Sequence, residues 1–386
     1  MFNLTRIAKR VAFALPIVAW SLVPIAVAAG PGVPTCGDDA DAWLLKSMRR
    51  SFSSHVTAVI IQRDPAGEDQ HQTVRVERSK DGKVHHVVTQ PLRRQGTESV
   101  DDGKRLRVYL PDQNVMIDQA SPHLQEDDAE ARWKLARKNY DLKFGTSVKI
   151  AGRDTHCIVA SPHDDRMDTR RYYVDRKTGY PLRMETSSPE GGKRIIYDTR
   201  EIQFPSEIDP ERFEMKPVGG ARVLSYDPPQ SLKAPDAKRK LGFAPILPPN
   251  LPMGFKVQDM QLTTSDRWRA LAVRISDGLV KATVYQWLSS NDVKIRSMEM
   301  GSSGTVGDVR LLVVSEMSND IRRDLLRAFT RSGEIGTLQP AGWCFQPIDP
   351  AQDLVLTGWE PYFSPMQLTV LTANKSHSGT VICAGP

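Results

Sequence analysis

The 386-residue sequence lacks the local motifs that commonly mark an enzyme active site. It has no G-x-S-x-G, no H-E-x-x-H, no P-loop and no G-x-G-x-x-G, so the corresponding hydrolase, protease and nucleotide-binding chemistries have no local signature. His85 and His86 are adjacent in an expected strand and point to opposite faces, so they cannot share a metal ion. His163-Asp164-Asp165 groups metal-ligand residue types, but a solvated loop is the simpler interpretation. We therefore expect no enzymatic activity, no metal and no cofactor.

Long hydrophobic runs are absent after the N-terminus. There, three basic residues precede an apolar run at 11–27, and Ala26-Val27-Ala28 offers a cleavage site, so residues 1–29 are predicted to be a cleaved secretory signal peptide. An uncleaved membrane anchor is the alternative, and the two prolines in the run argue against it. No later segment approaches the roughly 20 apolar residues that span a bilayer. We expect a periplasmic protein that is peripheral to the membrane.

No charge of one sign dominates: 52 Lys and Arg face 46 Asp and Glu, for a net charge of +6. Three of the basic residues lie in the predicted leader, so the exported chain carries about +3 (6 − 3). Such a mild balance does not indicate nucleic-acid binding. It is compatible with an anionic lipid or an acidic partner segment.

The sequence has only 4 cysteines, and none of them forms a C-x-x-C pair, which disfavours zinc and thioredoxin-like redox sites. An even number in an exported chain indicates disulfides. We predict a Cys344–Cys383 disulfide that ties a tail, residues 333–386, to the preceding unit. Cys36 and Cys157 either form a second pair, or Cys157 is a buried small side chain in its expected strand.

What the sequence does contain is short strand-like runs separated by turn residues. An amphipathic helix is expected at 38–52, followed by alternating runs over 55–119 with Asp, Gly and Pro between them. A charged helix is expected at 127–140, and further strands at 147–204. Turn residues at such short intervals predict an antiparallel meander.

The stretch TRRYYVDRKTGYPLRMET, residues 169–186, illustrates the pattern. Polar and apolar residues alternate on both sides of a Gly/Pro turn, which predicts a β-hairpin. A turn of this length is expected to need a positive φ at Gly179.

A change of composition divides the chain. Residues 36–220 form the first predicted domain, and 221–242, rich in Pro, Lys and Asp without a period, are interpreted as a linker. Residues 243–332 form a smaller α+β unit. It has a hairpin turn at Ser276-Asp277-Gly278 and a helix at 319–329.

Several short motifs occur in a characteristic order: DGKRLRVYLPDQNV, TGYPLR, LPMGF and SDGL. In this order the chain resembles the MucB/RseB family of periplasmic sigma-E regulators over roughly residues 38–331. The N-terminal domain of that family is similar in fold to the lipoprotein carriers LolA and LolB. The resemblance therefore implies an α+β fold: an unclosed antiparallel half-barrel with helices covering its concave face, plus a smaller α+β domain. The tail, 333–386, has no recognised counterpart.

The resemblance also implies a function. The protein is expected to bind the exported part of a membrane-anchored anti-sigma factor, and lipid or lipopolysaccharide in the concavity is expected to release it. Tyr109, Trp133 and Tyr172 are candidates to line that groove, although ordinary core packing explains them equally well. A lipid or lipoprotein carrier and an envelope structural protein are the alternatives. No partner-binding residue is marked by a motif.

Overall fold

The computed structural model describes seven segments of the chain: residues 39–49, 53–63, 71–121, 129–225, 230–264, 269–290 and 301–331. The predicted signal peptide, Cys36, and the tail with Cys344 and Cys383 lie outside these segments, so cleavage and the disulfide stay predictions. Among the described residues, no helix is long and apolar enough to cross a membrane.

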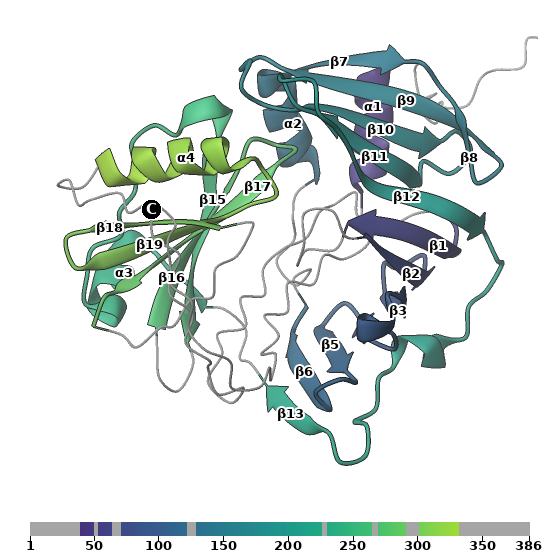
Figure 1. The fold of residues 1–386 in the computed structure, drawn as a ribbon, viewed down its shortest axis with the longest axis horizontal. Helices are drawn as coiled ribbons and strands as arrows, with labels where there is room; N and C mark the ends of the chain where they lie inside the picture. The colour runs from purple at the N-terminus through teal and green to yellow at the C-terminus, as the bar shows by residue number, and fades with distance from the viewer. Residues whose placement is uncertain are drawn as a thin grey trace, which may run out of the picture. The chain divides into compact units, whose positions relative to one another are not determined.

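Thirteen described strands form one large sheet (Figure 1). They are β1 (Val56–Arg63), β2 (His71–Arg78), β3 (Val84–Gln90), β4 (Glu98–Asp101), β5 (Arg105–Leu110), β6 (Val115–Ala120), β7 (Tyr140–Gly145), β8 (Lys149–Ile150), β9 (Arg153–Pro162), β10 (Thr169–Asp175), β11 (Pro181–Ser187), β12 (Lys193–Gln203) and β13 (Arg222–Ser225). The order is β13-β6-β5-β4-β3-β2-β1-β12-β11-β10-β9-β7, and β8 pairs with β9. Because β13 and β7 occupy the two ends of this order, the sheet is unclosed, as expected.

The predicted meander is confirmed along most of this sheet, since neighbouring strands pair antiparallel. The last strand departs from the expectation: β13 pairs parallel with β6, from Arg222 opposite Val115 to Ser225 opposite Asp118. The sheet is therefore mixed. Strands such as β1 and β5 alternate between buried and half-buried residues, as a period of two requires.

The predicted hairpin is formed by β10 and β11, with Arg171 opposite Glu185. Gly179 has a φ of +80°, which confirms the expected left-handed turn position. The carboxylate of Asp175 accepts hydrogen bonds from the backbone N–H groups of Thr178 (2.8 Å) and Lys177 (3.0 Å) and so closes the turn.

Helices α1 (Ala40–Met48) and α2 (Ala129–Asn139) confirm the two predicted helices. Asp39 caps α1 by accepting a hydrogen bond from the Asp41 N–H at 3.1 Å. Helix α1 contacts β7, β9, β10 and α2, and its buried residues join the apolar core of the large sheet. We call the sheet face that carries this core the inner face, and the opposite one the outer face.

The segment predicted as an aperiodic linker, 221–242, contains regular structure. It includes β13, β14 (Gln230–Ser231) and the helix α3 (Ala234–Leu241). Ala237 and Leu241 are buried at a spacing of one turn, and Gly242 ends the helix with a φ of +83°. The prediction missed these elements because β13 depends on pairing with a distant strand and α3 is too short to show a period.

A second, antiparallel sheet has the order β14-β15-β16-β17-β19-β18. Its other strands are β15 (Lys256–Thr264), β16 (Arg269–Ser276), β17 (Lys281–Leu288), β18 (Gly301–Val306) and β19 (Val309–Val314). Helix α4 (Asn319–Arg331) contacts β18 and β19, so the predicted hairpin and helix are both confirmed. We call this sheet with α3 and α4 the small-sheet unit.

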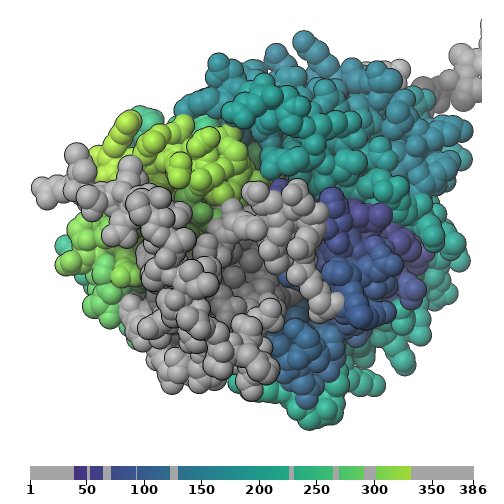
Figure 2. Space-filling model, in the orientation of Figure 1, coloured from purple at the N-terminus to yellow at the C-terminus, as the bar shows by residue number. Residues whose placement is uncertain are grey.

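Helix α4 has the spacing of apolar residues that is typical of a surface helix. Ile321, Leu325 and Phe329 are buried at a spacing of four residues, while charged residues lie on the opposite side. The segment of α4, yellow-green in Figure 2, lies at the surface of the molecule.

Candidate functional site

The inner face of the large sheet carries an extended apolar cluster. Side chains from α1 and from both halves of the sheet contribute to it, including Leu44, Ile60, Val76, Ile158, Leu182 and Met184. Two of the three groove candidates belong to this cluster. Tyr172 is fully buried in it, and Trp133, on α2, is half-buried against it.

The third candidate, Tyr109, does not share this face. In β5, Leu106, Val108 and Leu110 form an apolar cluster with β6, and the intervening Tyr109 points the other way. Tyr109 packs near Val100 and Phe213 on the outer face and hydrogen-bonds to Asn114 through its hydroxyl at 3.2 Å. Tyr109 therefore lies on the sheet face opposite the one that carries Tyr172, and the groove proposal keeps Tyr172 and Trp133.

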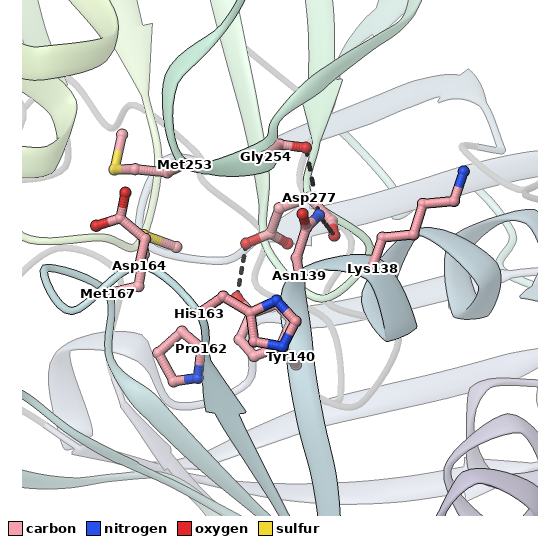
Figure 3. Close-up of a pocket in the computed structure, with 10 residues that line it drawn as sticks. All are labelled: Lys138, Asn139, Tyr140, Pro162, His163, Asp164, Met167, Met253, Gly254 and Asp277. Atoms are coloured by element: carbon pink, nitrogen blue, oxygen red, sulfur yellow. Dashed lines mark hydrogen bonds between the residues drawn. The ribbon is translucent and has the colours of Figure 1, made fainter.

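Two turns of the small-sheet unit contact the end of α2 (Figure 3). The Asn139 side-chain N–H donates to the carbonyl oxygens of Asp277 (2.7 Å) and Gly254 (3.3 Å). The Tyr140 hydroxyl donates to Asp277 Oδ2 at 2.6 Å. The turns are the LPMGF and SDGL motifs of the sequence, so both motifs meet at the junction of α2 and β7.

A glycine is required where the SDGL turn meets α2. Gly278 has a φ of +106°, and a Cβ built on it would lie 2.6 Å from the Arg132 carbonyl oxygen and 2.7 Å from Ala136 Cα. Any side chain at position 278 would both strain the backbone and push the turn away from the helix. The close approach explains why this turn carries glycine.

Burial is the largest influence on the pKa values of Asp277 and Tyr140. Burial raises the pKa of Asp277, although hydrogen bonds from Tyr140 and from the backbone N–H groups of Val280 and Leu279 favour the carboxylate. Burial and then the neighbouring Asp277 raise the pKa of Tyr140 well above its usual value. The tyrosine therefore stays protonated, and its hydroxyl donates a hydrogen bond to the Asp277 carboxylate.

Two ion pairs join the same parts of the chain. Arg170, on the inner face of β10, donates from Nη2 to Glu316 Oε1 at 2.7 Å, and the two side chains are 4% and 14% exposed. Arg166 donates to Asp324 of α4 at 2.9 Å, and this arginine is 49% exposed. The first pair is shielded from water and the second is at the surface.

A cavity of about 260 Å3 lies beside these contacts, as Figure 3 shows. Its walls combine polar and apolar side chains from both parts: Lys138, Asn139, Tyr140, Pro162, His163, Asp164, Met167, Met253, Gly254 and Asp277. Asn139 and Tyr140 bond to Asp277 within this wall, whereas His163 and Asp164 pair with Asp141 and Arg166 outside it.

The outer face carries a histidine between two carboxylates. His85 Nδ1 lies 2.9 Å from Glu77 Oε2, and its Nε2 lies 2.8 Å from Glu98 Oε1. Arg212, from the 3-10 helix η3 (Pro210–Phe213), donates to the same Glu77 at 2.8 Å. Burial lowers the pKa of His85, but the two carboxylates outweigh it and the pKa is raised overall.

His86 and Cys157 are buried too, and burial shifts the pKa of each away from its usual value. His86 lies on the inner face between Val84 and Val88, and burial, aided by the charge of His85, lowers its pKa to about 3. Cys157 is a free, buried thiol whose pKa burial raises. Among the residues described, no group of three or more His, Cys, Asp or Glu could hold a metal ion.

These features define a large unclosed sheet with a covered apolar face, joined to a smaller unit through buried polar contacts. Residues 39–214 match the MucB/RseB N-terminal domain family. The matched stretch covers less than half of the chain, and it is similar to the N-terminal domain of MucB/RseB proteins. No curated protein sequence matches the chain.

Solved structures agree on the fold. The structure of the Pseudomonas aeruginosa MucA/MucB complex contains a chain that is 15% identical, with a TM-score of 0.50, and the match covers 74% of this chain and 96% of that one. A crystal structure of MucB is 14% identical at a TM-score of 0.50, covering 75% and 96%. A LolA-superfamily protein from Nitrosomonas europaea is 13% identical, covers 46% and 98%, and has a TM-score of 0.23, too low to support an argument.

Sequence reasoning misses the contacts that join the two sheets. LPMGF and SDGL stand out as motifs, but nothing local pairs them with Asn139 and Tyr140, which lie more than 100 residues earlier. Arg170 is, by sequence, only one residue of an alternating strand. Its position two residues before Tyr172 in the same strand is the one signal, because it places a charge on the same sheet face as that tyrosine.

Proposed function

We propose that this protein is a periplasmic regulator that binds the exported segment of a membrane-anchored anti-sigma factor and controls an envelope stress response. The match of residues 39–214 to the MucB/RseB N-terminal domain family carries this proposal. It is supported by the solved complexes of MucB with MucA, which match this chain in fold along nearly the whole length of MucB. Binding would shield the anti-sigma segment from proteolysis.

The regulating ligand is proposed to be lipid or lipopolysaccharide. In this proposal residues 36–220 form a LolA/LolB-like half-barrel, and an acyl chain lies on its inner face beneath α1 and α2, against Trp133 and Tyr172. The supporting observation is the continuous apolar cluster of that face, which α1 and α2 cover. The ligand releases the partner only if it binds the free protein better than the complex.

A binding measurement with two arms tests the proposal. The mature protein is titrated with the periplasmic segment of the host's own single-pass anti-sigma factor, first alone and then with lipopolysaccharide present. We expect binding that lipopolysaccharide weakens. Failure of the segment to bind would refute the regulator, and stoichiometric acyl chains in the purified protein would then favour a carrier.

A matched pair of variants sharpens the second arm. Trp133→Ala should reduce the effect of lipopolysaccharide while leaving binding of the segment intact, because Trp133 packs against the inner-face cluster. Tyr109→Ala removes an aromatic side chain that is also half-buried but lies on the outer face. It should leave both segment binding and the effect of lipopolysaccharide unchanged. Equal effects of the two substitutions would contradict a ligand on the inner face.

A further inference from the structure

Three buried polar side chains lie on three adjacent strands, β10, β11 and β12, on the inner face of the large sheet. Arg170 stands opposite Thr186 in the β10–β11 pair, and two residues along β11, Met184 stands opposite Tyr197 of β12. The exposed fractions of Arg170, Thr186 and Tyr197 are 4%, 2% and 1%. They interrupt the apolar cluster of this face, which also carries the buried polar residues His86 and Gln62, the latter opposite Tyr197.

Each of these side chains has a buried polar atom without a hydrogen-bond partner in the described part of the chain: Arg170 Nε, Thr186 Oγ1 and Tyr197 Oη. Buried polar groups are normally hydrogen-bonded, and an unpartnered one is unfavourable. A guanidinium N–H can only donate, and the two hydroxyls can both donate. The three atoms therefore present donors and one positive charge to the same side of the sheet.

The chemistry that satisfies such a group is an anion with several acceptor oxygens. Carboxylates and phosphates accept charge-assisted hydrogen bonds, and arginine is particularly suited to bind them. Among the neighbouring inner-face side chains, Met184, Leu182 and Ala160 are apolar, while Tyr172 interacts with Arg170. The site therefore fits a molecule with an anionic headgroup and an acyl chain better than a free anion or a neutral lipid.

Arg170 also has a partner outside the large sheet. Its Nη2 donates to Glu316 of the small-sheet unit, while its unpartnered Nε is a second donor on the same guanidinium. The positive charge of Arg170 is also felt by Tyr140 and Asp277, the second buried contact with that unit. A ligand anion at Arg170 would thus share or take over a charge that Glu316 uses.

We infer that Arg170, Thr186 and Tyr197 bind the anionic headgroup of an acyl ligand, and that this headgroup competes with Glu316 for Arg170. The inference rests on the proposed function, because it assumes an acyl ligand on the inner face. It adds the chemical class of the headgroup and a route to regulation. Occupation of the site weakens the contact between the large sheet and the small-sheet unit.

Calorimetric titration of the full mature protein tests the inference with three probes: dodecanoate, dodecanol and acetate. Dodecanoate should bind about tenfold or more tightly than dodecanol, on the scale usual for a charge-assisted contact, and acetate should not bind. Glu316→Gln keeps the size of the side chain but removes its charge. It should therefore tighten dodecanoate binding by about tenfold, the usual range for coupled sites, and leave dodecanol unchanged.

Two further variants control for general effects. Asp324→Asn removes a carboxylate that pairs with Arg166 at the exposed side of the same contact, and it should not change dodecanoate binding. Thr186→Val keeps the shape but removes the hydroxyl, so dodecanoate binding should weaken several-fold while dodecanol binding stays the same.

The outcomes separate this inference from the proposed function. If dodecanoate binds but Glu316→Gln leaves its affinity unchanged, or raises that of dodecanol equally, the inference is wrong and the lipid proposal stands. If neither dodecanoate nor dodecanol binds, both the inference and the lipid part of the proposed function are wrong. Binding of the anti-sigma segment is measured separately and decides the partner.

Discussion

The two faces of the large sheet both bury charged side chains, but they pair them in different ways. On the outer face, His85, Glu77, Glu98 and Arg212 bond to one another within the large sheet and its 3-10 helix η3. On the inner face, Arg170 pairs with Glu316 of the small-sheet unit. The outer-face network stabilises the large sheet alone. The Arg170–Glu316 pair also joins the large sheet to the small-sheet unit, so a ligand that binds Arg170 would affect that contact.

The inner face is the better candidate for a ligand-binding site, because its buried polar groups are less completely hydrogen-bonded. The outer-face histidine has an acceptor at each ring nitrogen, so its polar groups are satisfied. On the inner face, Arg170 Nε, Thr186 Oγ1 and Tyr197 Oη have no partner among the described residues. Unsatisfied donors beside an apolar cluster are therefore candidates for ligand binding, whereas the satisfied groups of the outer face stabilise the sheet.

The largest expected effect comes from removing the inner-face charge. Arg170→Met leaves Glu316 largely buried without its partner, which should lower the free energy of unfolding by about 3 kcal/mol. The adjacent Arg171→Met removes an arginine that bonds to Ser187 on the outer face and should cost less than about 1 kcal/mol. Urea unfolding of both variants measures the difference, and equal losses would remove the distinction between the faces.

A double variant completes this test. Replacing both partners, as Arg170→Met with Glu316→Leu, should recover most of the lost stability, because no buried charge remains unpaired. An additive loss in the double variant would mean that the two side chains do not form a coupled pair.

The two faces are predictable from the sequence, but their partners are not. Alternation in KVHHVVTQ places His85 and His86 on opposite faces, and the structure confirms this placement. The turn at Gly179 is likewise predictable, because a short Gly/Pro turn leaves few conformations. Such features depend on neighbours within a few residues.

The contacts between the two units depend on residues far apart in the chain. Asn139 and Asp277 are 138 residues apart, and Arg170 and Glu316 are 146 apart. A single sequence carries no local pattern that pairs them. The parallel strand β13 escapes prediction for the same reason, since its existence depends on the edge of β6.

The next largest effect is the pH dependence of stability that His86, on the inner face, should cause. His86 has a folded pKa of about 3, below the usual 6.5, so the unfolded chain binds its proton more readily between these values. Stability should therefore fall as the pH drops below 6.5, by about 2 kcal/mol at pH 5 from this group alone. His86→Leu should remove that part of the loss. Thermal melts at pH 7 and pH 5 compare the two, and an unchanged difference would show that His86 is not buried uncharged.

A further effect is expected at the β10–β11 hairpin. Gly179 has a φ of +80°, and a Cβ there would lie 2.7 Å from Lys46 Cε of α1. Gly179→Val should therefore lower the free energy of unfolding by roughly 1–3 kcal/mol. Gly191 has a φ of +95° but nothing within 4 Å of its Cβ, so Gly191→Val isolates the backbone strain from the contact with α1. If both variants melt like the wild type, strain at these turns is negligible.

The smallest effect is expected from the outer-face histidine, and it has the opposite sign to that of His86. The folded pKa of His85 is raised because Glu98 and Glu77 outweigh its burial. Its contribution is thus fully present below the unfolded pKa of about 6.5 and is lost as the pH rises through the folded pKa. Because Glu98 is 39% exposed, water screens the pair and the change should be about 1 kcal/mol or less. His85→Gln should flatten the decline in stability above pH 6.5 and leave the acid side intact. The two histidine variants thus report separately on the two faces, and a loss of the acid-side slope in His85→Gln would contradict their assignment.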